Sequence, residues 1–165
     1  MSVSLLPKIV ANQITDLTPE LLHSRGISLL MMDFDNTIVP YTNNIPTENV
    51  EKWLEMMKVS DIRLCVVSNS KKDRVKIFCE KYGLDCITHS KKPFPKGIRA
   101  CLDRYGVPAG QCALVGDQIF TDTLGANGCG VQSILVSAIH NHNFWLKSRH
   151  ALELPFIFAA RKRRI

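Results

Sequence analysis

Residues 28–37 read SLLMMDFDNT, an apolar run that ends in two aspartates, Asp33 and Asp35. A continuous apolar run, without polar residues at alternate positions, is typical of a strand that is buried on both faces of a parallel sheet. The run therefore predicts a buried strand, and it places two carboxylates at the carboxyl end of that strand.

The segments that follow alternate between buried strands and amphipathic helices. Strands are expected at RLCVVSNS (63–70), near 85–88, at QCALVGD (111–117) and at VQSILV (131–136), and helices at 47–58, 71–82, 95–105 and up to about residue 127. This alternation predicts an α/β fold: a three-layer, doubly wound (Rossmann-like) parallel sheet of about five strands with helices on both faces. In such sheets, ligands bind at the carboxyl ends of the strands.

Length and composition narrow the class of protein. With 165 residues, 45% of them hydrophobic and 22% charged, the chain is expected to form a single domain over residues 1–165. No apolar run reaches the ~18 residues of a transmembrane helix, and the start lacks the features of a secretory signal. The six cysteines form no C-x-x-C pair, and six free thiols predict a cytoplasmic location.

The net charge of +6 is concentrated near the end of the sequence. Residues from about 140–165 form a basic, partly apolar C-terminal tail, whereas residues 1–139 are nearly neutral, which argues against nucleic-acid binding by the whole domain. Such a tail suits peripheral contact with an anionic membrane, at the inner face, and it also leaves nucleic acid open as a partner. Composition alone favours the simpler interpretation, in which the apolar residues of the tail pack on the body.

Polar residues follow the predicted strands and could supply chemistry together. Asp33 and Asp35 could serve as nucleophile and general acid/base, or they could cap a turn. Ser68 and Asn69 come at the start of a predicted helix, where they could bind a phosphate group or simply cap the helix.

A lysine and a third carboxylate complete the set. Lys92 comes before a proline that restricts its backbone, which favours Lys92 over Lys91 as the positioned cation; a solvated lysine is the alternative. Gly116 permits a tight turn after its strand, so that Asp117 could bind Mg²⁺ and Asp122 could orient the loop. The alternatives are that Asp117 caps the next helix and that Asp122 interacts with the dipole of that helix.

The order of these residues resembles the four motifs of the haloacid dehalogenase (HAD) superfamily, over about residues 28–136. Ser68, Lys92 and Asp117 follow Asp33 by 35, 59 and 84 residues. The strings LLMMDFDNTIVPY, KKPFPKGIRACL and LVGDQIFTDTLGANGCG are similar to those of the YqeG-type, subclass IIIA HAD phosphatases. That group also resembles the phosphatidylglycerophosphate phosphatases of the mitochondrial type.

The resemblance implies a Mg²⁺-dependent phosphoric monoester hydrolase. Asp33 would attack phosphorus to form an aspartyl-phosphate, and Asp35 would protonate the leaving group and then activate water. The resemblance assigns the other roles as follows: Asp33, Asp35 (through its carbonyl) and Asp117 bind the metal; Ser68, Asn69 and Lys92 bind the phosphate; Thr37, Gly116 and Asp122 support the site.

The spacing of the motifs leaves no room for the cap domain that many HAD enzymes carry. Asp35 and Ser68 are 33 residues apart and Ser68 and Lys92 are 24 apart, and predicted elements fill both gaps. We therefore expect an open site and a bulky or membrane-presented substrate, such as phosphatidylglycerophosphate. The alternatives are a nucleotide, a sugar phosphate or the phosphorylated end of a nucleic acid. A receiver-like signalling domain is disfavoured, because such domains lack an acid at the position of Asp35.

Overall fold

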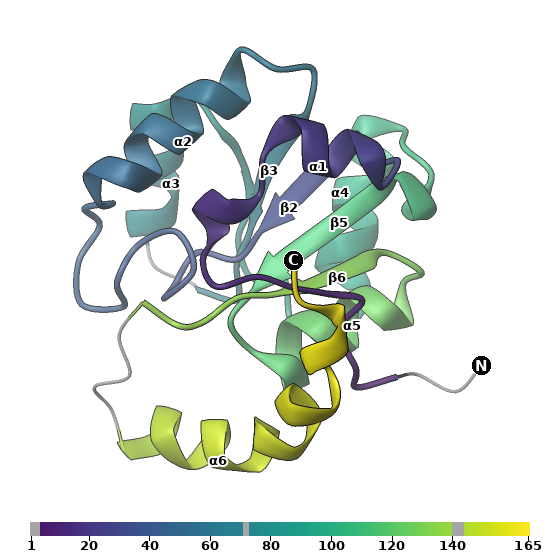
Figure 1. Ribbon diagram of the computed structural model, residues 1–165. Helices are drawn as coiled ribbons and strands as arrows, with labels where there is room; N and C mark the ends of the chain where they lie inside the picture. Colours follow the sequence, from purple (N-terminus) through teal and green to yellow (C-terminus); the bar gives the residue numbers. More distant parts are fainter. Residues whose placement is uncertain (1–3, 71–72, 140–143) are drawn as a thin grey trace.

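The computed structural model describes residues 4–70, 73–139 and 144–165, and a parallel sheet of six strands forms its centre (Figure 1). The strands are β1 (Ile9–Val10), β2 (Leu29–Met32), β3 (Arg63–Val67), β4 (Asp85–Ile87), β5 (Cys112–Gly116) and β6 (Gln132–Leu135). Their order is β1-β6-β5-β2-β3-β4, and every neighbouring pair is parallel. The chain builds outward from β2 to β4 and then returns to β5 on the other side of β2. The doubly wound fold predicted from the sequence is therefore confirmed.

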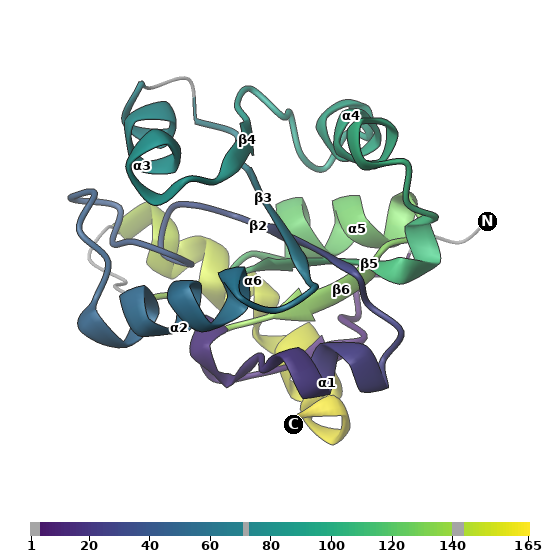
Figure 2. The ribbon, with the colours of Figure 1, turned by 90° about the horizontal axis from the view of Figure 1, so that it is seen from above.

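Helices cover both faces of this sheet (Figure 2). The α-helices are α1 (Pro19–Ser24), α2 (Glu48–Lys58), α3 (Arg74–Tyr82), α4 (Lys96–Tyr105), α5 (Leu124–Gly128) and α6 (Phe144–Ala159). Shorter turns are η1 (Ile14–Asp16), η2 (Ala109–Gln111), the π-helical η3 (Ile119–Thr123) and η4 (Arg161–Arg163).

Alternate residues of β2 enter two separate parts of the core. Leu30 and Met32 pack with residues of α1, α2 and α3, whereas Leu29 and Met31 pack with residues of α4 and α5. All four side chains have an exposed fraction of 0%. Because β2 is held from both faces and by β3 and β5 at its edges, the position of the residue that follows it, Asp33, is tightly fixed.

Two of the predicted helices show the boundaries that their sequences indicate. Thr47 precedes α2, and its hydroxyl accepts a hydrogen bond of 3.3 Å from the Val50 amide, as an N-cap residue does. Helix α3 ends at Gly83, whose φ of 62° is the left-handed conformation that glycine adopts without strain.

The N-terminal elements were not predicted from the sequence. Strand β1 adds a sixth strand at the edge of the sheet, where the amides of Lys8 and Ala11 donate to the carbonyls of Ser133 and Leu135. Two apolar residues show no periodicity, so nothing in the sequence marked β1 as a strand. Nothing resembling an inserted cap domain occurs in residues 4–70 and 73–139, where a loop and α2 separate β2 from β3 and only α3 separates β3 from β4.

The tail forms a helix and returns to the sheet. Helix α6 lies against η3, and the Ile165 amide then donates to the Val10 carbonyl of β1 (Figure 1). The tail is therefore attached to the body at both η3 and β1. None of the helices in the described ranges is long and apolar enough to cross a bilayer.

Candidate active site

The carboxyl ends of the three central strands meet at one edge of the sheet and bring the predicted residues together. Asp33 follows β2, Ser68 follows β3 and Asp117 follows β5. The first two remain in the ladder of backbone hydrogen bonds: the Asp33 amide donates to the Val115 carbonyl and the Ser68 amide to the Ile87 carbonyl, both at 2.9 Å. The sheet itself therefore holds the start of each site segment.

Lys92 is the centre of the site. Its Nζ lies 2.7 Å from Oδ1 of Asp33 and 2.8 Å from Oδ1 of Asp122. The Lys92 residue is only 4% exposed, and Asp33 and Asp122 are similarly buried. Neighbouring Lys91 is exposed, so the structure places Lys92 rather than Lys91 among the carboxylates.

Asp117 completes a cluster of three carboxylates that has the chemistry of a divalent-cation site. One carboxylate oxygen from each of Asp33, Asp117 and Asp122 lies within 4.8 Å of the other two. Oδ1 of Asp117 is buried and has no hydrogen-bond partner among the described residues. Buried polar atoms normally have partners, and hard oxygen ligands suit Mg²⁺, so these residues fit a bound divalent metal.

The charges in this cluster shift one another's pKa values. Burial raises the pKa of Asp117 well above its usual value, and the negative charges of Asp33 and Asp122 raise it further. Burial also raises the pKa of Asp122, to about 6, although Lys92 opposes that effect. Burial alone would lower the pKa of Lys92, but Asp122 and Asp33 raise it above its ordinary value, so Lys92 stays charged.

Asn69 fixes the backbone of the lysine segment. Its Oδ1 accepts hydrogen bonds from the Lys92 amide and the Ser90 hydroxyl, both at 2.7 Å, and its Nδ2 donates to the Lys92 carbonyl at 2.9 Å. The neighbouring Ser68 hydroxyl accepts from the Ser70 amide at 3.0 Å. The side chain of Asn69 is thus engaged in positioning Lys92, a role that sequence analysis did not assign to it.

Asp35 lies beside a residue that sequence analysis missed. Arg74, at the first position of α3, forms an ion pair with Oδ1 of Asp35 and donates to the Tyr41 carbonyl at 2.7 Å. Its guanidinium group also lies over the Phe34 ring, 5.1 Å from the centroid. A cation at a helix N-terminus opposes the helix dipole, and that unusual position was the available sequence signal for Arg74.

The turn after Asp35 is held by Asn36. The Asn36 amide donates to the Val39 carbonyl at 2.7 Å, and its carbonyl and side chain accept from the amides of Ile139 and Tyr41. Thr37 is buried, and its hydroxyl has no hydrogen-bond partner among the described residues. Asn36 therefore holds this turn, and the supporting role of Thr37 that the resemblance implies stays a prediction.

Gly116 is required for a reason other than the expected tight turn. A Cβ atom at this position would lie 2.3 Å from Cγ and Oδ2 of Asp122, which is far inside van der Waals contact. Asp122 is held there, because its Oδ2 accepts from the Gln118 amide at 3.2 Å. The missing side chain of Gly116 thus makes room for Asp122.

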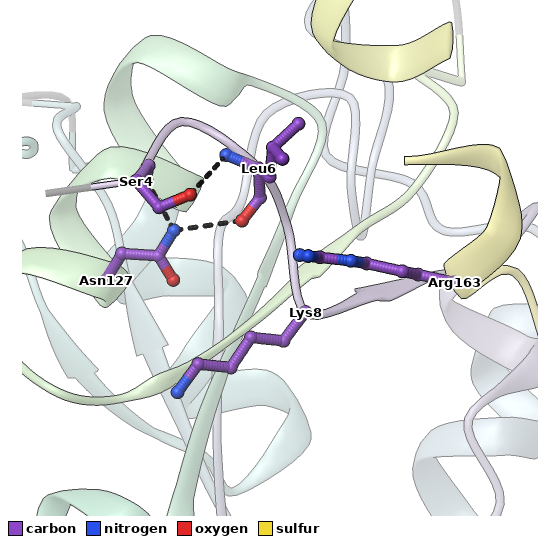
Figure 3. Close-up of a pocket in the computed structure, with 5 residues that line it drawn as sticks. All are labelled: Ser4, Leu6, Lys8, Asn127 and Arg163. Atoms are coloured by element: carbon purple, nitrogen blue, oxygen red, sulfur yellow. Dashed lines mark hydrogen bonds between the residues drawn. The ribbon is translucent and has the colours of Figure 1, made fainter. Parts of the chain in front are cut away.

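Two surface pockets differ in their relation to this cluster. A pocket of about 280 Å³ lies at the same edge of the sheet and is lined by Thr37, Thr47 and Ser137 among others. A pocket of about 470 Å³ is lined by Ser4, Leu6, Lys8, Asn127 and Arg163 (Figure 3). The larger pocket has no carboxylate in its lining and lies near the amino end of β1, so it is not part of the candidate active site.

Comparison with known proteins is consistent with this arrangement. A family model described as mitochondrial PGP phosphatase matches residues 2–139. A Bacillus subtilis (strain 168) protein described as "Probable phosphatase YqeG" is 34% identical over 131 residues, which are 79% of this chain and 76% of that protein.

Solved structures share the fold at low sequence identity. A HAD-superfamily hydrolase from Ehrlichia chaffeensis has a TM-score of 0.53 at 16% identity and covers 79% of this chain and 98% of its own. The cobalt-bound deoxy-D-mannose-octulosonate 8-phosphate phosphatase from Haemophilus influenzae has a TM-score of 0.53 at 16% identity. The match covers 84% of this chain and 92% of that chain.

Proposed function

Because this chain belongs to the mitochondrial PGP phosphatase family, we propose that it is a Mg²⁺-dependent enzyme that hydrolyses phosphatidylglycerophosphate through an aspartyl-phosphate intermediate. The family and the fold identify the protein as a phosphatase of the HAD superfamily. The observation that carries the proposal is the position of Lys92 between Asp33 and Asp122, beside the unpartnered oxygen of Asp117.

Asp33 would be the nucleophile. Its carboxylate would form a bond to phosphorus as the bond from phosphorus to the leaving alcohol breaks, which gives the aspartyl-phosphate. The ion pair with Lys92 fixes the orientation of this carboxylate at the end of β2. Attack from a fixed position accounts for much of the rate enhancement in enzymatic phosphoryl transfer, because the reacting groups need not be brought together from solution.

Lys92 and Ser68 would stabilise the transferring group. The Lys92 ammonium, which remains protonated, would offset negative charge on the phosphoryl oxygens, and the Ser68 hydroxyl would donate a hydrogen bond to one of them. Asn69 would contribute indirectly through its three hydrogen bonds with the segment that carries Lys92.

Asp35 would act as general acid and base. It would donate a proton to the leaving alkoxide and later take one from the water that hydrolyses the aspartyl-phosphate. In the structure Oδ1 of the Asp35 carboxylate pairs with Arg74, which holds the side chain in place.

Asp33, Asp117 and the main-chain carbonyl of Asp35 would hold the metal ion. When bound, Mg²⁺ would supply positive charge that offsets the negative charge of the phosphoryl group. Oδ1 of Asp117 has no hydrogen-bond partner among the described residues, and burial with the charges of Asp33 and Asp122 raises the pKa of Asp117, both of which support this assignment. Asp122 would support the site mainly through Lys92.

Two features support a lipid substrate presented at a membrane. The described elements between the site segments include no inserted domain that could enclose a small substrate. On the tail, Leu152, Leu154 and Phe158 are 68%, 50% and 65% exposed, and the basic residues of η4 follow them. Exposed apolar side chains beside cations suit an anionic lipid surface, at about 1 kcal/mol for each basic residue near it.

The proposal can be tested by phosphate release from phosphatidylglycerophosphate in mixed micelles, with and without Mg²⁺. We expect turnover only with Mg²⁺, no turnover in Asp33→Asn, and full turnover in the control Asp103→Asn, whose carboxylate is exposed on α4. A panel of nucleotides, sugar phosphates and 5′-phosphorylated oligonucleotides is assayed in parallel.

Each arm of this experiment bears on a separate part of the proposal. Turnover by Asp33→Asn would refute the covalent mechanism. A tenfold preference for any soluble ester over the lipid would refute the lipid substrate while leaving the mechanism intact. Binding to vesicles is measured separately: we expect the protein to sediment with anionic vesicles and not with neutral ones.

A further inference from the structure

Glu153 is a buried acidic residue in a basic segment. It lies in α6, outside the stretch that the family model matches, and it is only 2% exposed. Its Oε1 accepts hydrogen bonds from the backbone amides of Ile119 at 2.9 Å and Phe120 at 3.3 Å. A carboxylate this deeply buried needs specific partners, and these two amides belong to the turn that follows Asp117.

The turn that Glu153 contacts has no side-chain cap of its own. Helical residues continue from Ile119 through η3 and α5, and the first amides of a helical segment have no partner within it. Gln118 precedes the segment and makes no capping hydrogen bond with its side chain. Glu153 therefore supplies, from another helix, the acceptor that an N-cap residue would otherwise provide.

The same turn carries Asp122 into the site. Asp122 accepts from the Gln118 amide through Oδ2 and meets Lys92 through Oδ1. Three successive backbone amides of this turn therefore have carboxylate acceptors. Asp122, inside the site, accepts from the first of them, and Glu153, outside the site, accepts from the next two. A ring contact between Phe120 and Phe156, with centroids 6.2 Å apart, adds a second link between the turn and α6.

We propose that Glu153 is a positioning residue of the phosphatase site: it fixes the turn that carries Asp122, and Asp122 in turn fixes Lys92 against Asp33. The inference rests on the site proposed above, because it assumes that Lys92 acts on the phosphoryl group. It makes α6 a part of the active enzyme through Glu153, which does not itself touch the reacting groups. Residues that position reacting groups indirectly affect activity by about 10- to 100-fold when they are removed.

The test compares three substitutions in the full chain. Glu153→Gln keeps an acceptor oxygen of the same reach, Glu153→Asp draws the carboxylate back by one methylene, and Glu153→Leu removes the acceptor at similar volume. Glu55→Leu is the matched control, because Glu55 is an exposed glutamate on α2, outside the site. Two measurements are made on each: kcat and KM for p-nitrophenyl phosphate, and amide hydrogen exchange of residues 119–123.

We expect Glu153→Gln to keep kcat within about threefold. Glu153→Asp and Glu153→Leu should lower kcat by about 10- to 100-fold, with a smaller change in KM. Exchange at residues 119–123 should rise in the two impaired variants while the central strands stay protected. A purely structural role would reduce the amount of folded enzyme and would not lower kcat of the folded fraction.

The proposal fails if Glu153→Asp and Glu153→Leu both keep wild-type kcat, or if Glu153→Gln is as impaired as Glu153→Leu. If Glu153→Leu does not fold, the comparison of Glu153→Asp with Glu153→Gln decides. A failure of the proposed site itself would be seen elsewhere, as wild-type activity in Lys92→Met. Loss of activity in that variant together with normal activity in Glu153→Asp would refute only the role of Glu153.

Discussion

The Nζ atom of Lys92 lies 2.7 Å from Oδ1 of Asp33, although 59 residues separate the two in the sequence. The same ammonium group neutralises Asp122, so one cation is shared by two buried carboxylates. The arrangement keeps Lys92 protonated and gives it a fixed direction, which is the state that a phosphate-binding cation requires.

Replacing this cation should damage activity and stability together. We expect Lys92→Met to lower kcat/KM by about 10²–10³, the usual cost of one charge-stabilising donor. Two uncompensated buried carboxylates should also cost about 3–5 kcal/mol of unfolding free energy. Phosphate release and urea unfolding measure the two effects. Lys91→Met, at the exposed neighbouring position, should change neither.

Removing the charge of Asp117 should stabilise the metal-free protein while abolishing its response to Mg²⁺. Burial and the charges of Asp33 and Asp122 raise the pKa of Asp117, so its ionised form destabilises the fold. The stability of the metal-free wild type should therefore fall as pH rises through that elevated pKa, and the advantage of Asp117→Asn should grow over the same range.

Urea unfolding at several pH values, with and without Mg²⁺, measures both effects. At 100 times the dissociation constant, Mg²⁺ should stabilise the wild type by about 2.7 kcal/mol and leave Asp117→Asn unchanged. Equal stabilisation of the two proteins would show that Asp117 does not bind the metal.

The contact between Gly116 and Asp122 predicts a sharp difference between two glycines. Gly116→Ala would place Cβ 2.3 Å from the Asp122 carboxyl group, so we expect a loss of about 1–3 kcal/mol of stability and a clear loss of activity. Gly110→Ala is the control, since a Cβ atom there meets nothing within 4 Å. Similar thermal unfolding and turnover in the two variants would contradict the proposed reason for Gly116.

Substitution of Asp35 should separate the two halves of the reaction. With an alkyl phosphate, Asp35→Asn should lower kcat by about 10²–10⁴, because the alkoxide cannot leave without a proton. With p-nitrophenyl phosphate, nitrophenolate leaves unaided, so rapid mixing should show a burst followed by slow hydrolysis of the phosphorylated Asp33. Equal loss with both esters, and no burst, would remove Asp35 from the role of acid.

Much of the site's layout was predictable because it depends on strand ends. The buried runs before Asp33, Ser68 and Asp117 marked parallel strands, and parallel strands bring their carboxyl ends to one edge. The proline after Lys92 correctly distinguished it from Lys91 as the lysine placed at the carboxylates.

Two functional residues could not be identified from the sequence, because their partners lie far away along the chain. Arg74 meets Asp35 from the start of α3, and Glu153 meets Ile119 from a helix that begins 25 residues later. Arg74 stands at the wrong end of its helix for a cation, and Glu153 is the sole acid among the basic residues of the tail. A charge in such a position can point to a partner, but the sequence does not identify which residue that partner is.

The residues of the candidate active site follow strands β2, β3, β4 and β5, and α6 contacts the turn after Asp117. This arrangement affects how refolding of the protein can be followed. No contiguous fragment contains Asp33, Lys92, Asp117 and Glu153 without most of the fold between them. Contacts between such remote parts of a chain form late, because long loops must close first. Recovery of enzymatic turnover after dilution from denaturant should thus follow the last step of refolding, and an activity assay would serve as a sensitive monitor of complete assembly.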